Sequence, residues 1–312
     1  MTGPASPPVL HGGFPIGYAD HYPLHLPPGH RFPAEKYALL KAQLLHRGIV
    51  SEDQLFDPPF IEEAAILRAH TPAYWHQLKD LALPPAHKRR IGLPLTEHLL
   101  RRAWASASIT FWAARAALST GIGGNLGGGT HHAYADRGEG FCVLNDVAIS
   151  ALDLLASGAI ERALVIDLDV HQGNGTAKLL AHEPRVFTWS VHCSANYPAP
   201  KEQSDLDTEL PPGTDDATYL ATVTDLLPQV LAAARPNLVY YIAGSDVLAG
   251  DRLGRLAVSP EGMAERDRCV FAAIRQRGIP LVLLLGGGYH RTLARAIDAH
   301  TTTYALAHQF FT

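Results

Sequence analysis

The 312 residues of the chain, 47% of them hydrophobic and 18% charged, suffice for one large α/β domain or two smaller ones and match the composition of a soluble globular protein. A formal net charge of −4, with no basic stripe, argues against a nucleic-acid partner. No secretory signal and no apolar stretch near the roughly 18 residues of a membrane span is present, so no membrane association is expected. Three widely separated cysteines indicate neither a disulfide framework nor a thiolate zinc site, and we expect a cytoplasmic protein.

From about residue 95 onward, helical patterns alternate with apolar runs, which is typical of βαβ units and a parallel sheet. Pro228 is expected to kink or break one of the helices. Without internal repeats or linkers, residues 1–312 are predicted to form one domain, a central parallel β-sheet flanked by α-helices, with residues 1–13 irregular. Helices are predicted at residues 96–118, 144–156, 216–234, 260–277 and 291–307, and strands at 163–168, 186–191, 238–243 and 280–285.

One predicted strand ends in acidic residues. The apolar run at 163–168 leads into Asp167, Asp169 and His171, which alternate along the chain. Residues two apart on an extended segment point to the same face, so these side chains converge. Buried carboxylates are costly unless a cation holds them. The pattern therefore predicts a divalent metal site at the end of a parallel strand, although Asp169 and His171 could instead cap loops.

Three other polar clusters follow strands or glycine-rich turns, at residues 127–132, 244–246 and 286–290. Ligands of open α/β sheets bind beyond the carboxyl ends of the strands, so we expect the clusters to meet there. Asp169, His171 and Asp246 would supply oxygen, nitrogen and oxygen ligands and leave a coordination position open, as in catalytic sites. This ligand set suits zinc and is also compatible with iron, cobalt or manganese.

Two further features suggest catalysis beside that ion. The adjacent histidines His131 and His132 could form an acid–base pair, one of them moving a proton and the other stabilising charge. Tyr289 follows three glycines, and its hydroxyl could donate to an oxyanion. Each feature alone also has an ordinary explanation, a surface turn for the histidines and core packing for the tyrosine.

Four blocks of this sequence resemble the histone deacetylase superfamily. They are residues 127–132 continuing through 138–146, residues 167–176, residues 286–289, and residues 244–259. The last block is most similar to the class IV, or type 11-like, branch and its bacterial relatives. The resemblance covers about residues 14–308. It implies the arginase/deacetylase α/β fold and zinc-dependent hydrolysis of N-acyl-lysine amides.

The resemblance also implies roles for individual residues. Asp169, His171 and Asp246 would bind the metal ion. His132 would act as general base and then acid, His131 as its electrostatic partner, and Tyr289 would polarise the acyl carbonyl. Asp167 would support His131, and Asn174, neutral where some relatives carry aspartate, would support His132. Substrate-binding positions would be Gly140, Phe141, Gly287 and Gly288.

A monovalent cation, K⁺ in relatives, is the other implied ion. Its site would use Asp167, Asp169 and His171 with the backbone of Ser190 and Val191. Phe141 would form one wall of the acyl-lysine tunnel. The segment at 192–198 does not match the aromatic loop of the better-known classes, so Tyr197 is only one candidate for the opposite wall.

The substrate is expected to be an acylated lysine peptide or a small acyl-amine, and the sequence fixes neither the acyl chain length nor the oligomeric state. A small-molecule deacetylase acting on acetylpolyamines or acetoin-related metabolites is one alternative. A two-metal ureohydrolase-like enzyme and a non-catalytic acyl-lysine binder are the others.

Overall fold

The structure is a computed structural model that describes residues 13–312. Its strands are β1 (Ile16–Gly17), β2 (Leu55–Phe56), β3 (Ile122–Asn125), β4 (Ala163–Asp167), β5 (Val186–Cys193), β6 (Leu206–Leu210), β7 (Leu238–Ile242) and β8 (Leu281–Leu284). Its α-helices are α1 (Lys36–His46), α2 (Glu63–Ala69), α3 (Pro72–Lys79), α4 (Pro85–Ile91), α5 (Glu97–Thr120), α6 (Asp146–Ala156), α7 (Asn174–Leu180), α8 (Asp216–Ala234), α9 (Pro260–Gln276) and α10 (Leu293–Phe311), with one 3₁₀ turn, Glu52–Gln54.

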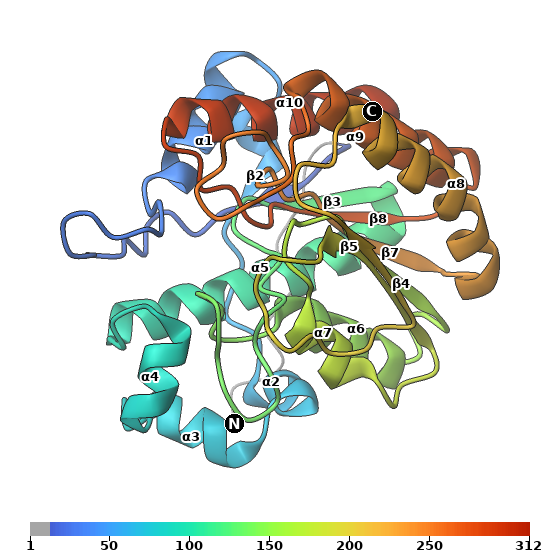
Figure 1. Cartoon of the computed structure of the whole chain (residues 1–312). Helices are drawn as coiled ribbons and strands as arrows, with labels where there is room; N and C mark the ends of the chain where they lie inside the picture. Colours follow the sequence, from blue (N-terminus) through green and yellow to red (C-terminus); the bar gives the residue numbers. More distant parts are fainter. Residues whose placement is uncertain (1–12) are drawn as a thin grey trace.

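All eight strands form one parallel sheet in the order β2-β1-β3-β8-β7-β4-β5-β6. Helices α1, α8, α9 and α10 cover one face, while α2, α5 and α6 lie on the other (Figure 1). The predicted fold class is therefore confirmed. No helix within residues 13–312 combines the length and hydrophobicity that crossing a bilayer requires.

The pleat of the central strands explains both the core and the position of the acidic residues. In β4, Leu164 and Ile166 join the hydrophobic cluster under α8 and α9, whereas Ala163 and Val165 join the cluster under α5 and α6. A strand covered on both faces reads as a continuous apolar run, as predicted. Beyond the strand the alternation continues, because Leu168 and Val170 pack in the first cluster. Asp167 and Asp169, which alternate with these apolar residues, therefore point toward the opposite side.

The predicted helices and strands from residue 96 onward are present, with ends shifted by a few residues. A break at Pro228 was the wrong expectation, because α8 runs through this residue without interruption. Proline removes one helical hydrogen bond, and four buried side chains around it hold the helix on the sheet: Val223, Leu227, Val230 and Leu231. The prediction of an irregular segment at 1–13 falls almost wholly outside the described residues.

The contact between β3 and α5 depends on a residue without a side chain. A Cβ at Gly123 would lie 2.2 Å from the backbone oxygen of Ala113 in α5. Backbone atoms cannot rotate away, so any larger residue must push the helix off the sheet.

Gly123→Ala should therefore lower the free energy of unfolding by about 1–3 kcal/mol, the usual cost of overpacking. Urea denaturation followed by circular dichroism measures it. Gly124→Ala is the matched control, since its Cβ would meet only side chains, the nearest at 3.1 Å. Equal stability of the two variants would contradict this account of the packing.

Candidate active site and metal centre

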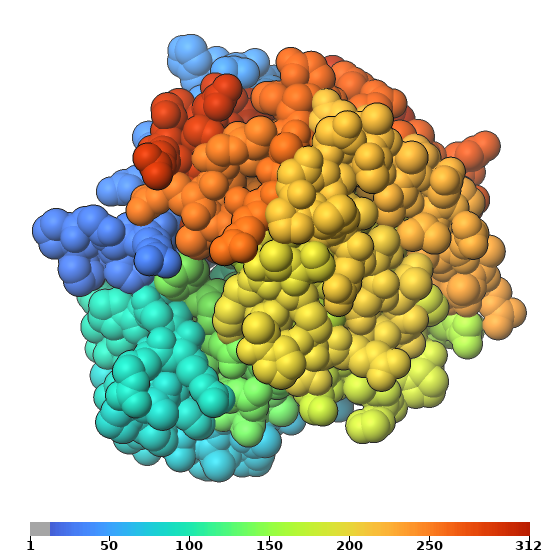
Figure 2. Space-filling model, viewed as in Figure 1, coloured from blue at the N-terminus to red at the C-terminus, as the bar shows by residue number. Residues whose placement is uncertain are grey.

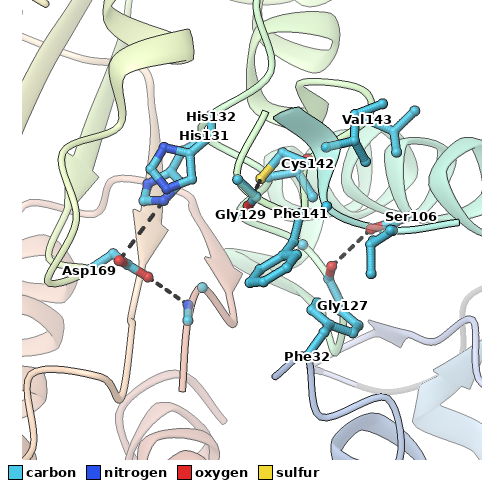
Figure 3. A pocket seen from close by; sticks show the side chains of 18 of the residues that line it. Phe32, Ser106, Gly127, Gly129, His131, His132, Phe141, Cys142, Val143 and Asp169 are labelled. Atoms are coloured by element: carbon cyan, nitrogen blue, oxygen red, sulfur yellow. Dashed lines mark hydrogen bonds and ion pairs between the residues drawn. The ribbon is translucent and has the colours of Figure 1, made fainter. Parts of the chain in front are cut away.

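Four loops at one edge of the sheet carry the predicted site residues. His131 and His132 lie in the loop after β3, Tyr289 after β8, Asp246 after β7, and Asp169 with His171 after β4. These four strands are consecutive neighbours in the sheet, so their carboxyl ends meet. All of these side chains except that of Asp246, which lies behind Asp169 and His171, line a common cavity, which Figure 3 shows from close by with Phe141 across from the histidines. The predicted convergence of the clusters is thus present.

Asp169, His171 and Asp246 form a compact buried group whose ligand atoms all lie within 4.8 Å of one another. The imidazole Nδ1 of His171 lies 3.0 Å from Asp169 Oδ1 and 3.2 Å from Asp246 Oδ2. Asp246 Oδ2 is buried and accepts no hydrogen bond from residues 13–312. One nitrogen and two carboxylate oxygens that converge in this way fit a divalent cation.

The remaining carboxylate oxygens are held by backbone amides. Gly287 N–H donates to Asp169 Oδ2 at 2.6 Å, and Val170 N–H donates to Asp246 Oδ1 at 3.0 Å. A Cβ at Gly287 would lie 2.0 Å from Asp246 Oδ2, so this position requires glycine. The amides fix the carboxylates with their other oxygens directed toward His171.

The charges of this group require a positive partner. Burial and the neighbouring charge of Asp169 raise the pKa of Asp246 to about 6. Burial alone would lower the pKa of His171, but the neighbouring carboxylates of Asp169 and Asp246 raise the pKa of its imidazole to about 10. A cation between the carboxylates would take over the role of that proton and leave the imidazole neutral, as a metal ligand must be.

The two adjacent histidines have opposite electrostatic environments. His131 Nδ1 bonds Asp167 Oδ2 at 2.7 Å, whereas His132 Nδ1 bonds the neutral Asn174 Oδ1 at 2.6 Å. Against the effect of burial, the charges of Asp167 and Asp169 raise the pKa of His131 to about 9. Burial, together with the charges of His131 and His171, holds the pKa of His132 well below its usual range. The pair thus combines a cationic imidazole with a neutral one that can accept a proton.

Tyr289 completes the group. Its backbone N–H donates to Asp251 Oδ2 at 2.7 Å, and its ring centroid lies 6.4 Å from that of His171. Burial raises the pKa of the phenol well above its usual range, so the hydroxyl stays protonated and can donate a hydrogen bond.

The histone deacetylase domain model matches residues 30–304, nearly the whole chain. The chain belongs to the histone deacetylase family. It is 38% identical over 96% of its length to an uncharacterized protein of Picosynechococcus, all of which is covered. It is 31% identical over 86% of its length to histone deacetylase 2 of Arabidopsis thaliana, of which 72% is covered. The predicted family is confirmed, while the class IV branch stays a prediction.

Two solved structures share the fold of this deacetylase-family hydrolase. Acetylpolyamine aminohydrolase from Burkholderia pseudomallei superposes with a TM-score of 0.77 at 22% identity, covering 94% of this chain and 98% of that one. The HDA15 HD domain gives 0.76 at 22% identity, covering 93% and 89%. At 22% identity, this structural similarity is evidence for a shared fold alone.

Aromatic side chains stand on both sides of this cavity. Phe141 lies 6.0 Å from Tyr289 between ring centroids, and Phe32 lies 5.4 Å from Phe141. The candidate Tyr197 packs edge-on against His132 at 5.0 Å and lines the same cavity. Gly140 and Gly287 also line it, whereas Gly288 lies behind the loop, where a Cβ would meet Ser245.

The polar partners of Asn174 include residues to which the sequence analysis assigned no role. Its Nδ2 donates to the Tyr134 hydroxyl at 3.0 Å and lies 3.4 Å from Glu139 Oε1. The Tyr197 hydroxyl also donates to Glu139. This glutamate, one residue in a glycine-rich loop, connects the support of His132 to the cavity wall.

Lys36 is a second residue that sequence reasoning missed. It is 1% exposed on α1, and its Nζ lies 3.4 Å from the Gly286 carbonyl, behind the Tyr289 loop. Burial lowers the pKa of its amine to about 8 despite the nearby carboxylates. A lone lysine within a helical segment gives no motif from which this position could be recognised.

The residues proposed for a monovalent cation are neighbours. Asp167 pairs with Ser190 in the register of β4 and β5. Asp167 Oδ1 accepts the Asp169 amide at 3.2 Å, and the Ser190 hydroxyl lies 2.9 Å from His192 Nδ1. A K⁺ site at this place stays a prediction.

The neutral partner of His132 leads to a test of its proton-accepting role. Asn174→Asp would place a carboxylate against Nδ1 and raise the pKa of His132 by about 1–3 units. A base must be deprotonated to act, so the rising limb of the plot of kcat/KM against pH should move to higher pH. Asn174→Gln keeps the neutral charge and is the control. Unchanged limbs in the aspartate variant would rule out this coupling.

Proposed function

We propose that this protein is a zinc-dependent deacylase that hydrolyses the amide between an acyl group and the ε-amine of lysine. The single observation that carries the proposal is the meeting of the Asp169–His171–Asp246 group, the two unlike histidines and Tyr289 around one cavity of about 420 Å³. Zinc bound by the three ligands would supply a Lewis acid and lower the pKa of water. One such group occurs among residues 13–312, which favours a single ion over a two-metal enzyme.

The proton-transfer roles follow from the two imidazoles. His132, neutral and buried, takes a proton from the attacking water and returns it to the departing lysine amine. His131, held as a cation by Asp167, stabilises the negative charge that develops beside it. The Tyr289 hydroxyl donates a hydrogen bond to the oxyanion as the carbonyl carbon becomes tetrahedral. With each of these groups in place, a non-catalytic binder has little support.

The cavity extends beyond the reacting groups into an apolar chamber. Leu99, Leu126 and Leu144, each no more than 3% exposed, line it. Two polar side chains there are already bonded to backbone, Ser106 to the Gly127 carbonyl at 3.0 Å and Arg102 to carbonyls of the N-terminal loop. Figure 3 shows Ser106 and Gly127 bonded in this way. The chamber therefore suits acyl groups longer than acetyl.

Tyr289→Phe should reduce kcat by about 10²–10³-fold, the usual cost of losing one oxyanion donor. The protein should still bind one zinc ion per chain, measured by elemental analysis. Tyr197→Phe, which removes a hydroxyl from the cavity wall, should cost much less. Full turnover in the Tyr289 variant would remove the tyrosine from the reaction.

A substrate panel tests the proposal as a whole. Lysine peptides carrying acetyl, butyryl, octanoyl and myristoyl groups are compared with acetylpolyamines, with chelator and after zinc is restored. Chelator should abolish hydrolysis and zinc should recover it. Each methylene buried contributes about 0.8 kcal/mol, so kcat/KM should rise roughly threefold to fourfold per methylene until the chamber is full.

Leu99→Trp, which fills the chamber, should lower the ratio of octanoyl to acetyl hydrolysis. If acetylpolyamines were hydrolysed well and acyl peptides hardly at all, the small-molecule alternative would replace the protein substrate.

A further inference from the structure

The entrance of the catalytic cavity carries exposed arginines that have no carboxylate partner among residues 13–312. Arg31, Arg90 and Arg255 line the same cavity as His132 and Tyr289. They come from three distant segments, the loop before α1, the end of α4 and the loop after β7. All three are exposed, and within residues 13–312 none forms an ion pair. The recess between these segments is visible in Figure 2.

A second hollow extends this positive surface. Arg31 lines it together with Arg252 and Arg291, both exposed and, within residues 13–312, without a carboxylate partner. Asp251 also lines the hollow, but its oxygens already accept the backbone N–H groups of Leu253 at 2.8 Å and Tyr289 at 2.7 Å. This carboxylate is thus turned toward the loop backbone that it holds.

The acidic residues near the entrance are also occupied. Asp20 pairs with Lys41 at 2.5 Å. Glu139 lies 3.5 Å from the guanidinium of Arg137 and accepts the Tyr197 hydroxyl. Five arginines therefore face solvent around the cavity, in a chain whose formal net charge is −4.

The backbone ties one of these arginines directly to the cavity wall. The Arg90 carbonyl accepts the Gly140 amide at 3.0 Å, and the next residue along, Ile91, accepts the Phe141 amide at 2.9 Å. The end of α4 is therefore fixed against the wall that would flank an acyl-lysine stem, so the Arg90 side chain lies beside the path of a bound substrate.

We infer that the substrate carries acidic groups beside its acylated amine, so that an acidic peptide segment, not a polycation, is the preferred partner. The inference rests on the proposed deacylase function. A single exposed ion pair contributes about 0–1 kcal/mol, but several like charges facing one ligand act together and accelerate encounter. The same charges repel a polyamine, whose remaining amines are protonated.

Three peptides of one sequence test this, with the acyl-lysine flanked by glutamate, glutamine or lysine. At low ionic strength, kcat/KM should be about tenfold higher for the glutamate peptide than for the lysine peptide. The ratio of kcat/KM for the glutamate peptide to that for the lysine peptide should fall toward one at 1 M salt, where the Debye length is about 3 Å. Equal kcat/KM for the three peptides, or a preference for lysine flanks, would overturn the inference.

The triple variant Arg31→Gln, Arg90→Gln, Arg255→Gln should lose most of the preference. The control removes the same charge at the opposite edge of the sheet, before β5, β7 and β8, with Arg185→Gln, Arg235→Gln and Arg277→Gln. It should keep the preference, and its loss in both variants would point to net charge alone and overturn the role of the entrance.

Binding separates this inference from the proposed reaction. Fluorescence anisotropy with the same labelled peptides should give tighter binding of the glutamate peptide by wild-type protein, reduced in the entrance variant only. Selective binding with no hydrolysis of any peptide would refute the deacylase function and keep the charge preference. Hydrolysis with no charge preference would refute the inference and keep the function.

Discussion

Two buried carboxylates, those of Asp169 and Asp246, impose the central constraint on this molecule. Their charges repel, and burial makes each more costly. Backbone amides from other loops compensate for this cost. The Gly287 amide, after β8, donates to Asp169, which follows β4. The Val170 amide, after β4, donates to Asp246, which follows β7. Asp246 therefore ties the ends of the neighbouring strands β7 and β4, and Asp169 ties β4 to β8, which lies one strand further along the sheet.

A buried cation behind the loops supports the same arrangement. Arg266 of α9 is fully buried, donates to the Gly244 carbonyl at 2.8 Å and pairs with Asp267 at 2.8 Å. Its carbonyl partner lies two residues before Asp246, so α9 helps to fix the position of the loop that follows β7 and carries Asp246. The helix layer on this face thus contributes to the site geometry as well as to the core.

Patterns that depend on neighbouring residues could be predicted from the sequence. The run ending in Asp167 gave strand β4 and the shared direction of Asp169 and His171, because strand periodicity is local. The fold class followed from alternating runs and helices. Strands β1 and β2 have two residues each, too few for any periodicity, and α1 to α4 were left unassigned. Helix α1 mixes buried Leu40 and Leu44 with buried Lys36, so its pattern is interrupted.

Contacts that cross between loops could not be predicted in this way. Asp246 could be placed beside Asp169 and His171 only from the family resemblance or from the assumption that the strand ends converge. Glu139 and Lys36 lie behind the proposed site residues because distant segments fold onto them; Lys36 stands in no motif, and nothing within the 138–146 block singles out Glu139. The site was therefore predictable where its residues form blocks and unpredictable where single residues support them.

The difference between His131 and His132 shows how such support sets chemistry. The rings are adjacent in sequence, 4.1 Å apart between centroids, and similarly buried, so their own composition cannot distinguish them. The carboxylates of Asp167 and Asp169 favour the cationic form of the first imidazole, whereas burial and the charges of His131 and His171 keep the second neutral, because its partner Asn174 brings no charge against them. A second carboxylate in place of the amide would favour protonation of His132 and move the range in which it can accept a proton to higher pH. The neutral residue after β4 thus helps to set the pH range of the proposed proton transfer, as the charged residue at the end of β4 sets the charge of His131.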